Sequence, residues 1–137
     1  MLDKIYIVAG DEMQKLMKKN FPERKTIPFR EDFSKGDYRG FEFDDDMIRR
    51  RSNYWKVSKE EYIEKMSSII NLDLSKEYIL CFGEDKCCTF NLNFMLEYLK
   101  NLGYSKDIQV NIVNEYNLDI LKEYVINKNS WNSRVFI

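Results

Sequence analysis

The stretch from Tyr78 to Gly103 constrains the fold of this chain more than any other part of the sequence. Tyr78–Phe82 is apolar at every position, as expected of a strand that is covered on both faces. The polar turn Gly83-Glu84-Asp85-Lys86 follows, and apolar residues then recur at helical spacing up to Gly103, which suits a helix stop. We therefore expect half of a parallel α/β unit, with its turn at the carboxyl end of the strand, where open α/β sheets bind ligands.

Three other segments read as strands. Lys4–Ala9 is a second apolar run and predicts a buried strand. Lys25–Phe29 contains Pro28, which cannot donate a backbone hydrogen bond and so belongs at a sheet edge. Ile108–Ile112 alternates, which predicts a half-exposed strand near the other edge. The expected fold is a three-layer α/β sandwich with a mostly parallel, Rossmann-like or flavodoxin-like sheet of four to five strands, four of them in the order 2-1-3-4.

Helices are predicted between these strands. Gly10 turns the first strand into a helix for which Asp11 is a natural N-cap. Ser58 and Glu61 have the spacing of a capping box, which predicts a helix that begins at Ser58. Apolar residues at helical spacing near the end of the chain predict a last helix, marked by Leu118, Leu121, Tyr124 and Val125.

The segment between the second and third strands carries an acidic triplet, Asp44-Asp45-Asp46, followed by Arg49-Arg50-Arg51. On a helix, Asp45 lies four residues before Arg49, and Asp46 four before Arg50, which is the favourable orientation for ion pairs. We expect most of this cluster to be a self-paired surface. One arginine, taken as Arg50, is a candidate to turn inward and bind a phosphate or carboxylate.

Length and charge limit the class of protein. The 137 residues are most simply one α/β domain, and the net charge of −1 argues against non-specific nucleic-acid binding. No window is apolar enough to cross a bilayer, and the N-terminus lacks the shape of a signal peptide. The three cysteines, Cys81, Cys87 and Cys88, are an odd number with two neighbours, so we expect reduced thiols and a cytoplasmic location without membrane partners.

The sequence contains no histidine. Nucleophile–histidine pairs and histidine-containing metal sites are therefore excluded. A three-cysteine metal site fits poorly, because Cys87 and Cys88 are adjacent and Cys81 is expected to point into the sheet packing. The chain also lacks a dinucleotide fingerprint and a phosphate-binding P-loop. We expect neither a metal nor a cofactor.

Charged loops follow three of the predicted strands, and the carboxyl ends of parallel strands meet at one edge of a sheet. The second of these loops, from Arg30 to Asp37, supplies cations, carboxylates and a hydroxyl within eight residues. We expect a ligand-binding site at this edge. Its candidate residues are Gly10, Asp11, Arg30, Ser34, Lys35, Arg50, Glu84, Asp85 and Lys86.

Several short motifs resemble those of one family of uncharacterised bacterial domains, domain of unknown function eighteen thirty-five. They are Gly10-Asp11, Asp32-Phe33-Ser34-Lys35-Gly36, Arg49 to Arg51 with Trp55, and Phe82-Gly83-Glu84-Asp85 with Asn91-Leu92. The resemblance spans nearly the whole chain, implies the same fold and site, and adds Asp32 and Asn91 to the candidate residues. Asp37 stands where the family usually has proline, and relatives often carry extra C-terminal sequence, so an activity that depends on that part is not expected here.

Three functions remain open. The first is a small-ligand binding module for an anionic, phosphorylated or nucleotide-like molecule, which the chain binds or sequesters. The second is a hydrolase or transferase that uses Glu84 or Asp85 as a base, which requires burial to raise a carboxyl pKa. The third is a protein-interaction domain or homo-oligomer that acts through the apolar tail Trp131–Ile137. The sequence favours binding over catalysis.

Overall fold

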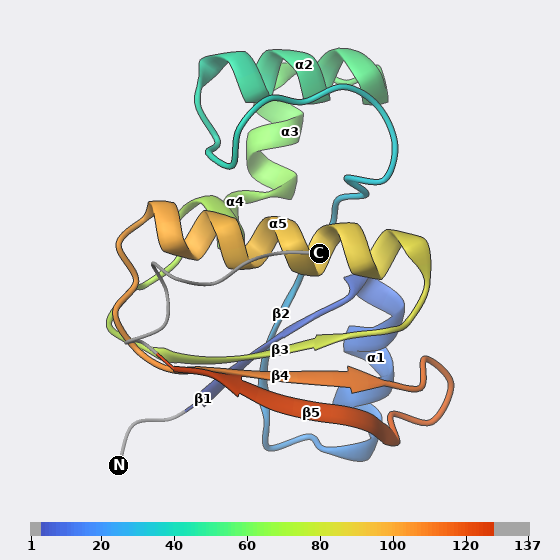
Figure 1. Ribbon diagram of the computed structural model, residues 1–137. Coiled ribbons are helices and arrows are strands. Elements are labelled where there is room, and N and C mark those ends of the chain that lie inside the picture. The colour runs from blue at the N-terminus through green and yellow to red at the C-terminus, as the bar shows by residue number, and fades with distance from the viewer. Residues whose placement is uncertain (1–3, 128–137) are drawn as a thin grey trace.

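A computed structural model describes residues 4–127, which form a five-stranded sheet with helices on both faces (Figure 1). The strand order is β2-β1-β3-β4-β5, with the first four strands parallel and β5 antiparallel to β4. The strands are β1 (Lys4–Val8), β2 (Lys25–Pro28), β3 (Glu77–Phe82), β4 (Ile108–Val113) and β5 (Ile120–Ile126). The helices are α1 (Gly10–Asn20), α2 (Asp45–Trp55), α3 (Lys59–Lys65), α4 (Ser67–Ile70) and α5 (Lys86–Asn101).

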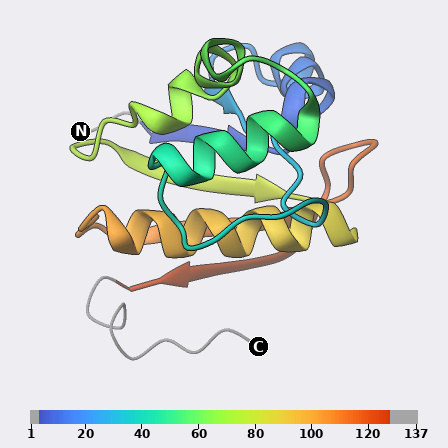
Figure 2. The ribbon, with the colours of Figure 1, turned by 90° about the horizontal axis from the view of Figure 1, so that it is seen from above.

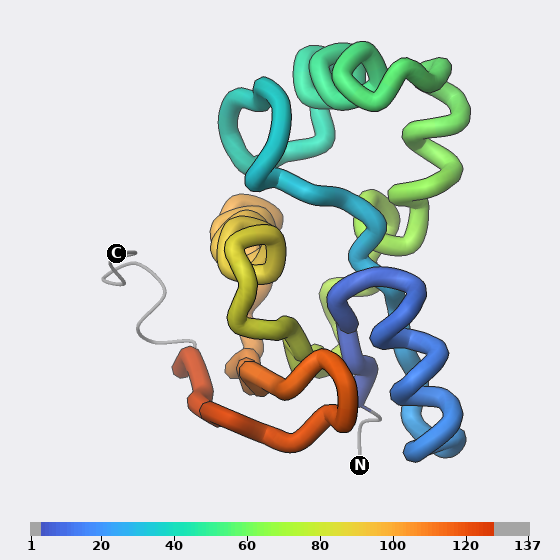
Figure 3. Tube along the Cα trace, turned by 90° about the vertical axis from the view of Figure 1, so that its right-hand side faces the viewer, coloured from blue at the N-terminus to red at the C-terminus, as the bar shows by residue number. Residues whose placement is uncertain are grey.

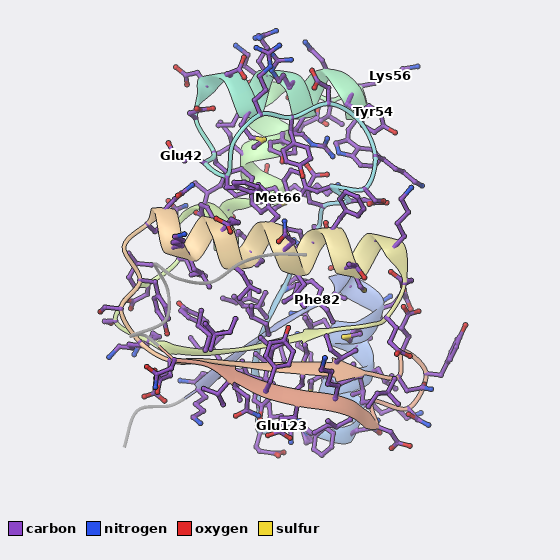
Figure 4. The ribbon with its side chains drawn as sticks, in the orientation of Figure 1. Glu42, Tyr54, Lys56, Met66, Phe82 and Glu123 are labelled. Carbon is purple, nitrogen blue, oxygen red and sulfur yellow. The ribbon has the colours of Figure 1, made fainter. Side chains whose placement is uncertain are left out.

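Two apolar clusters, one on each face of the sheet, confirm the predicted three-layer α/β fold. The larger cluster joins α5 to the strands and includes Phe82, which is fully buried between them (Figure 4). The smaller cluster joins α1 to the opposite face through Met13, Met17 and Val8. Each fully buried side chain of this size stabilises the fold by about 1.5–3 kcal/mol, so both helices are firmly docked.

Residues 29–66 leave the sheet after β2 and cover the side of α5 that faces away from the strands; we call this segment the cap. Figures 1 and 3 show α2 and α3 above α5, with the sheet below it. The rings of Phe33 in the cap and Phe94 in α5 stack with centroids 3.9 Å apart. Met66, at the end of the cap next to α5, is buried as well (Figure 4). The cap is therefore packed on α5 rather than loosely tethered.

The structure overturns the prediction of a last helix, because residues 120–126 form β5. The six residues between β4 and β5 fold as a tight hairpin loop, in which the Asn114 side chain accepts from the backbone N–H groups of Tyr116 and Asn117. Successive residues of β5 pair with β4, and Tyr124 and Ile126, two residues apart, turn toward the core. Leu118 lies in the loop and Leu121 in β5, so their helical spacing does not reflect a helix.

The presence of β5 also changes which strand lies at the sheet edge. The order 2-1-3-4 is confirmed for the parallel strands, with Pro28 in the edge strand β2 as predicted. The prediction that the alternating strand is the other edge is wrong, because β5 lies outside β4. The polar positions of β4 are less exposed than alternation indicated, since Asn111 is buried and Gln109 donates to Glu123 of β5.

The predicted helix starts are confirmed in part. Ser58 caps α3 by accepting from the backbone N–H of Glu61, and Asp85 caps α5 by accepting from that of Cys88. Asp11 is not an N-cap, because α1 already begins at Gly10, whose positive φ of 90° sets the turn. The Asp11 side chain is instead paired with Arg30.

The predicted thiol state agrees with the structure. Cys81 is buried in β3, and Cys87 and Cys88 are free rather than bridged. The tail Trp131–Ile137, which was assigned an interaction role, lies outside the described residues. Within residues 4–127, no helix has the length and apolar character that a membrane crossing requires.

Candidate functional site

A cavity of about 800 Å³ lies at the carboxyl ends of the parallel strands. Its walls come from the start of α1, the segment after β2, the cap helices, the start of α5 and the loop after β4. Figures 1 and 2 show the β4–β5 loop at the same end of the sheet as the start of α5. The lining residues are Ala9, Gly10, Asp11, Glu12, Met13, Leu16, Phe29, Arg30, Glu31, Asp32, Trp55, Lys65, Asp85, Cys87, Cys88, Asn91, Glu115 and Tyr116.

The structure brings part of the predicted site together here. Six of the eleven candidates line the cavity: Gly10, Asp11, Arg30, Asp32, Asp85 and Asn91. Two more lie beside it and contact Asp32, since Ser34 donates to its carboxylate and the Lys35 ammonium lies 3.9 Å away. The remaining three, Arg50, Glu84 and Lys86, are not among the lining residues.

The prediction that Arg50 turns inward is wrong, because Arg51 does so instead. Arg50 pairs on the surface with Asp46, at 2.8 Å, and with Asp37. Arg49 also pairs with Asp46 rather than with Asp45. Arg51 is the arginine that turns inward, and its side chain is fully buried. The helix directs only one of three consecutive arginines to the interior, and sequence alone does not fix which one.

Glu31, which sequence reasoning passed over, is the centre of a buried hydrogen-bond network at the cavity wall. Its carboxylate accepts two bonds from the Arg51 guanidinium, at 2.7 and 2.9 Å. It also accepts from the Trp55 indole at 2.8 Å and from the Tyr62 hydroxyl at 2.6 Å. Burial alone would raise the pKa of Glu31, but the bonds from Arg51 and Tyr62 hold it below its ordinary value, so the group is an anion.

Arg51 fixes the loop that carries the site, in addition to pairing with Glu31. Its remaining N–H groups donate to the backbone carbonyls of Asp32, at 2.9 Å, and Lys35, at 2.8 Å. The loop therefore closes around the guanidinium with its carbonyls inward. This arrangement fixes the backbone of residues 32–35, from which the Asp32 side chain extends to the cavity.

Asn91 ties the same loop to α5. Its Oδ1 accepts from the backbone N–H of Phe33 at 2.9 Å, and its Nδ2 donates to the backbone carbonyl of Glu31 at 2.7 Å. The side chain is buried and joins residues about sixty positions apart in sequence, so it fixes the loop after β2 against the helix that follows β3. Asn91 thus has a positioning role at the cavity wall.

The hydrogen bonds around Asp32 keep its carboxyl group ionised. Burial would raise its pKa, but the hydroxyl and backbone N–H of Ser34 both donate to it, and so does the Cys87 thiol, so the pKa is lowered. The thiol is in turn inactive as a nucleophile. Burial and its bond to Asp32 raise the pKa of Cys87 to about 12, which keeps it protonated at neutral pH.

Asp85 and Glu115 form a hydrogen-bonded carboxyl pair that also lines the cavity. The bond to Asp85, with burial and the charge of Asp85, raises the pKa of Glu115 to about 6. The pKa of Asp85 is lowered, because Glu115 and the backbone N–H of Cys88 both donate to it. Gly83 makes room for the pair, since a Cβ there would lie 2.6 Å from a Glu115 carboxylate oxygen. One proton is therefore held on Glu115 below about pH 6 and is lost as the pH rises toward neutrality.

The lining has more carboxyl groups than cations, although Glu31 is neutralised by the buried Arg51 behind it. Six of its residues carry carboxyl groups, and two, Arg30 and Lys65, carry cations. Arg30 is paired with Asp11 at 2.8 Å, and Lys65 lies 5.5 Å from the Trp55 ring centroid. Around Asp32, Asp85 and Glu115, negative charge is balanced only in part, by the exposed Lys35. This region attracts cations and hydrogen-bond donors.

One group of side chains could hold a metal ion. The donor atoms of Asp85, Cys88 and Glu115 lie within 4.8 Å of one another. The thiol is a poor ligand as it stands, because burial raises the pKa of Cys88 to about 12. The Asp85 carboxylate is also committed to capping α5. The pair is better suited to hold a proton than a metal.

Glu115 was missed although a signal for it exists. It follows β4, a parallel strand, and so lies at the same sheet edge as the three loops that were identified. Trp55, which lines the cavity, belonged to the family motif but was not carried into the candidate list. Lys65 and Tyr116 show no signal in the sequence, since the folding of the cap and of the hairpin loop brings them to the cavity.

Comparisons of the chain with known proteins found no match among family models, curated proteins or solved structures.

Proposed function

We propose that this chain binds a small nucleotide-like molecule in the cavity at the carboxyl edge of its sheet. The observation that carries the proposal is that polar side chains from five segments of the sequence line one cavity of about 800 Å³. A volume of this size suits a ligand of nucleotide dimensions. The resemblance of the short motifs to the uncharacterised bacterial family remains part of this proposal, because it implies a site at the same edge of the sheet.

The charge of the lining orients the ligand. Hydroxyl and amino groups of a sugar or base suit Asp32 and Asp85, which accept hydrogen bonds. A phosphate or other anionic group suits Arg30 and Lys65 and is repelled by the carboxylates. The Trp55 and Tyr116 rings supply apolar surface for a base.

Two measurements test the proposal. Heat-denatured protein should release a bound small molecule that mass spectrometry identifies, and calorimetry with nucleosides, nucleotides and sugar phosphates should find a ligand. Arg30→Ala removes a lining cation and should weaken binding of a phosphorylated ligand about tenfold, the effect of losing one charge-assisted hydrogen bond. Arg49→Ala is the control, because Arg49 pairs with Asp46 on the surface and is not among the lining residues. Equal affinity of both variants and the wild type would place the site elsewhere.

A protein-interaction role is the second candidate, and β5 gives the observation that favours it. Ile120, Leu121 and Val125 are each about half exposed on this edge strand, which could pair with another strand. Sedimentation of the purified protein tests this role. If the wild type stays monomeric at high concentration, as the Leu121→Lys variant is expected to, the result argues against this role.

A further inference from the structure

We propose that the cavity selects a nucleoside monophosphate, with the Trp55 ring as the surface on which the base stacks and the Lys65 ammonium as the cation that binds the single phosphate. This inference rests on the proposed function, because it names the class of ligand and the two side chains that select it. Trp55 and Lys65 both line the cavity, and the ammonium nitrogen lies 5.5 Å from the centroid of the indole ring.

The Trp55 ring is held in a fixed orientation at the cavity wall. Its indole N–H donates to the buried carboxylate of Glu31 at 2.8 Å, and the Tyr54 ring packs edge-on against it with centroids 4.8 Å apart. Trp55 is only partly buried and lines the cavity. A large flat ring that is fixed before the ligand arrives loses little entropy on binding, so it suits stacking against another planar ring.

The other two aromatic residues of the lining are less suited to stacking. Phe29 is 2% exposed, so most of its ring is already covered by the core. Tyr116 is 87% exposed on the hairpin loop, so its ring is not held by its surroundings. Trp55 combines an accessible ring with a fixed orientation, which makes it the residue that selects a ligand with a base.

The charges of the lining are largely balanced within the protein, except at Lys65. Four carboxylates are paired with cations, and the carboxyl groups of Asp85 and Glu115 are hydrogen-bonded to each other. The four ion pairs are Asp11–Arg30, Glu12–Lys15, Glu31–Arg51 and Asp32–Lys35. Lys65 has no carboxylate at ion-pair distance among residues 4–127, and its ammonium lies over the Trp55 ring instead.

The balance of charge sets the number of phosphates. A polyphosphate needs several cations or a metal ion to neutralise it. The lining offers the charge of Lys65, while Arg30 adds hydrogen-bond donors rather than net charge, because Asp11 balances it. One unpaired cation suits one phosphate.

The base and the phosphate belong to one ligand because their binding groups are neighbours. A sugar that links a base to its phosphate can span the short distance between the Trp55 ring and the Lys65 ammonium. Lys65 is exposed and its stem is flexible, so the ammonium can move from the ring to the phosphate when a base covers the ring.

Calorimetry with ribose 5-phosphate and with the four ribonucleosides, their 5′-monophosphates and their 5′-triphosphates tests the ligand class. We expect at least one monophosphate to bind, and ribose 5-phosphate to bind about tenfold more weakly or worse, because it lacks the stacking base. The matching nucleoside should also bind about tenfold more weakly, the effect of losing one charge-assisted hydrogen bond. The triphosphate should bind no more tightly than the monophosphate.

Variants test the two side chains separately. Lys65→Met should remove the preference for the monophosphate over the nucleoside, and Lys59→Met, at the exposed start of the same helix and outside the lining, should keep it. Trp55→Leu should remove the preference for the monophosphate over ribose 5-phosphate, and Trp55→Phe, which keeps a stacking ring, should retain most of it. Trp131→Phe leaves Trp55 as the single tryptophan, and the monophosphate should quench its fluorescence with the cavity unaltered.

Each result supports or overturns the inference. If ribose 5-phosphate binds as tightly as every monophosphate, or if Trp55 is not quenched, the inference is overturned, and the proposed binding function survives where Arg30→Ala still weakens binding. Failure of every probe to bind overturns both. A triphosphate that binds about tenfold more tightly than its monophosphate, or a Lys65→Met variant that keeps the full preference for phosphate, shows that other cations bind the phosphate and overturns the inference.

Discussion

Arg51 and Glu31 form a bidentate ion pair in which neither side chain is exposed to solvent. The pair joins the first turn of the loop after β2 to helix α2, twenty residues later in the chain. Both partners make further bonds, so nearly every polar atom of the pair has a partner. Breaking such a pair from one side is costly, because the remaining charge stays buried without compensation.

Replacing Arg51 by Met tests the stabilising role of this pair. The variant leaves the Glu31 carboxylate with neutral donors, from Trp55, Tyr62 and the backbone N–H of Asp32, and without a cation. We expect the free energy of unfolding to fall by about 3–5 kcal/mol. Chemical denaturation followed by circular dichroism measures this change. Arg49→Met removes an exposed ion pair and should change stability by less than about 1 kcal/mol. Similar values for the two variants would contradict a structural role for the buried pair.

Gly36 lies in the same loop, directly against the pair. Its φ is +78°, and a Cβ there would lie 2.7 Å from the Tyr54 ring and 3.0 Å from Arg51. Gly36→Ala therefore combines backbone strain with a steric clash. We expect it to destabilise the protein by more than the ~1–2 kcal/mol that an L-residue loses in the left-handed region.

Gly40→Ala provides the matched control for Gly36→Ala. Gly40 has a similar φ of +70°, but a Cβ there would meet no atom within 4 Å. Alanine at this position is therefore destabilised by backbone strain alone, without a steric clash. The difference between the two melting temperatures isolates the contact with Arg51 and Tyr54, and equal losses would show that the loop adjusts freely.

The parallel core could be predicted because local pattern and tertiary environment agree there. Tyr78–Phe82 is buried on both faces, and Pro28 lies in an edge strand, as their chemistry requires. β5 could not be recognised, because its exposed residues include Leu121 and Val125, whose spacing also fits a helix. Its pairing with β4 is a tertiary contact that overrides the local pattern.

The site could be predicted to the level of the sheet edge but not to the level of each side chain. The rule that strand ends converge located Asp11, Arg30 and Asp85 at the cavity. It did not identify Glu31 and Arg51, because a buried ion pair has no periodic signature and either neighbour of Arg50 could turn inward. The cap contributes Trp55 and Lys65 from a segment whose docking on α5 depends on long-range packing, including the stacked rings of Phe33 and Phe94.

Asn91→Ala tests whether the side chain positions the loop or only lines the cavity. The substitution leaves the backbone N–H of Phe33 and the carbonyl of Glu31 buried without partners. We expect a loss of about 1–3 kcal/mol in the free energy of unfolding. Asn93→Ala on the same helix, where the side chain is half-buried, should cost less. Hydrogen exchange should show faster exchange of the Phe33 amide in Asn91→Ala, and unchanged exchange there would argue against the positioning role.

The carboxyl pair of Asp85 and Glu115 gives the stability of the protein a specific pH dependence. The pKa of Glu115 is about 6 in the folded state, above its ordinary value of 4.5. Between these values the folded protein binds more protons than the unfolded chain, so this group's contribution to stability is present at low pH and is lost as the pH rises through about 6. Above that pH, two charged carboxylates face each other.

Glu115→Gln should remove this loss, because the amide stays neutral and can still donate to Asp85. We expect the variant to melt at a higher temperature than the wild type above pH 6, with the difference shrinking as the pH falls toward 4.5. Gly83→Ala tests the same pair from the other side, since its Cβ would displace the Glu115 carboxylate from a position 2.6 Å away. In that variant the Glu115 midpoint, followed by ¹³C NMR, should return toward 4.5 with little loss of stability, because the displaced group is the end of a flexible side chain. A midpoint that stays near 6 in Gly83→Ala would mean that burial, and not the bond to Asp85, holds the proton.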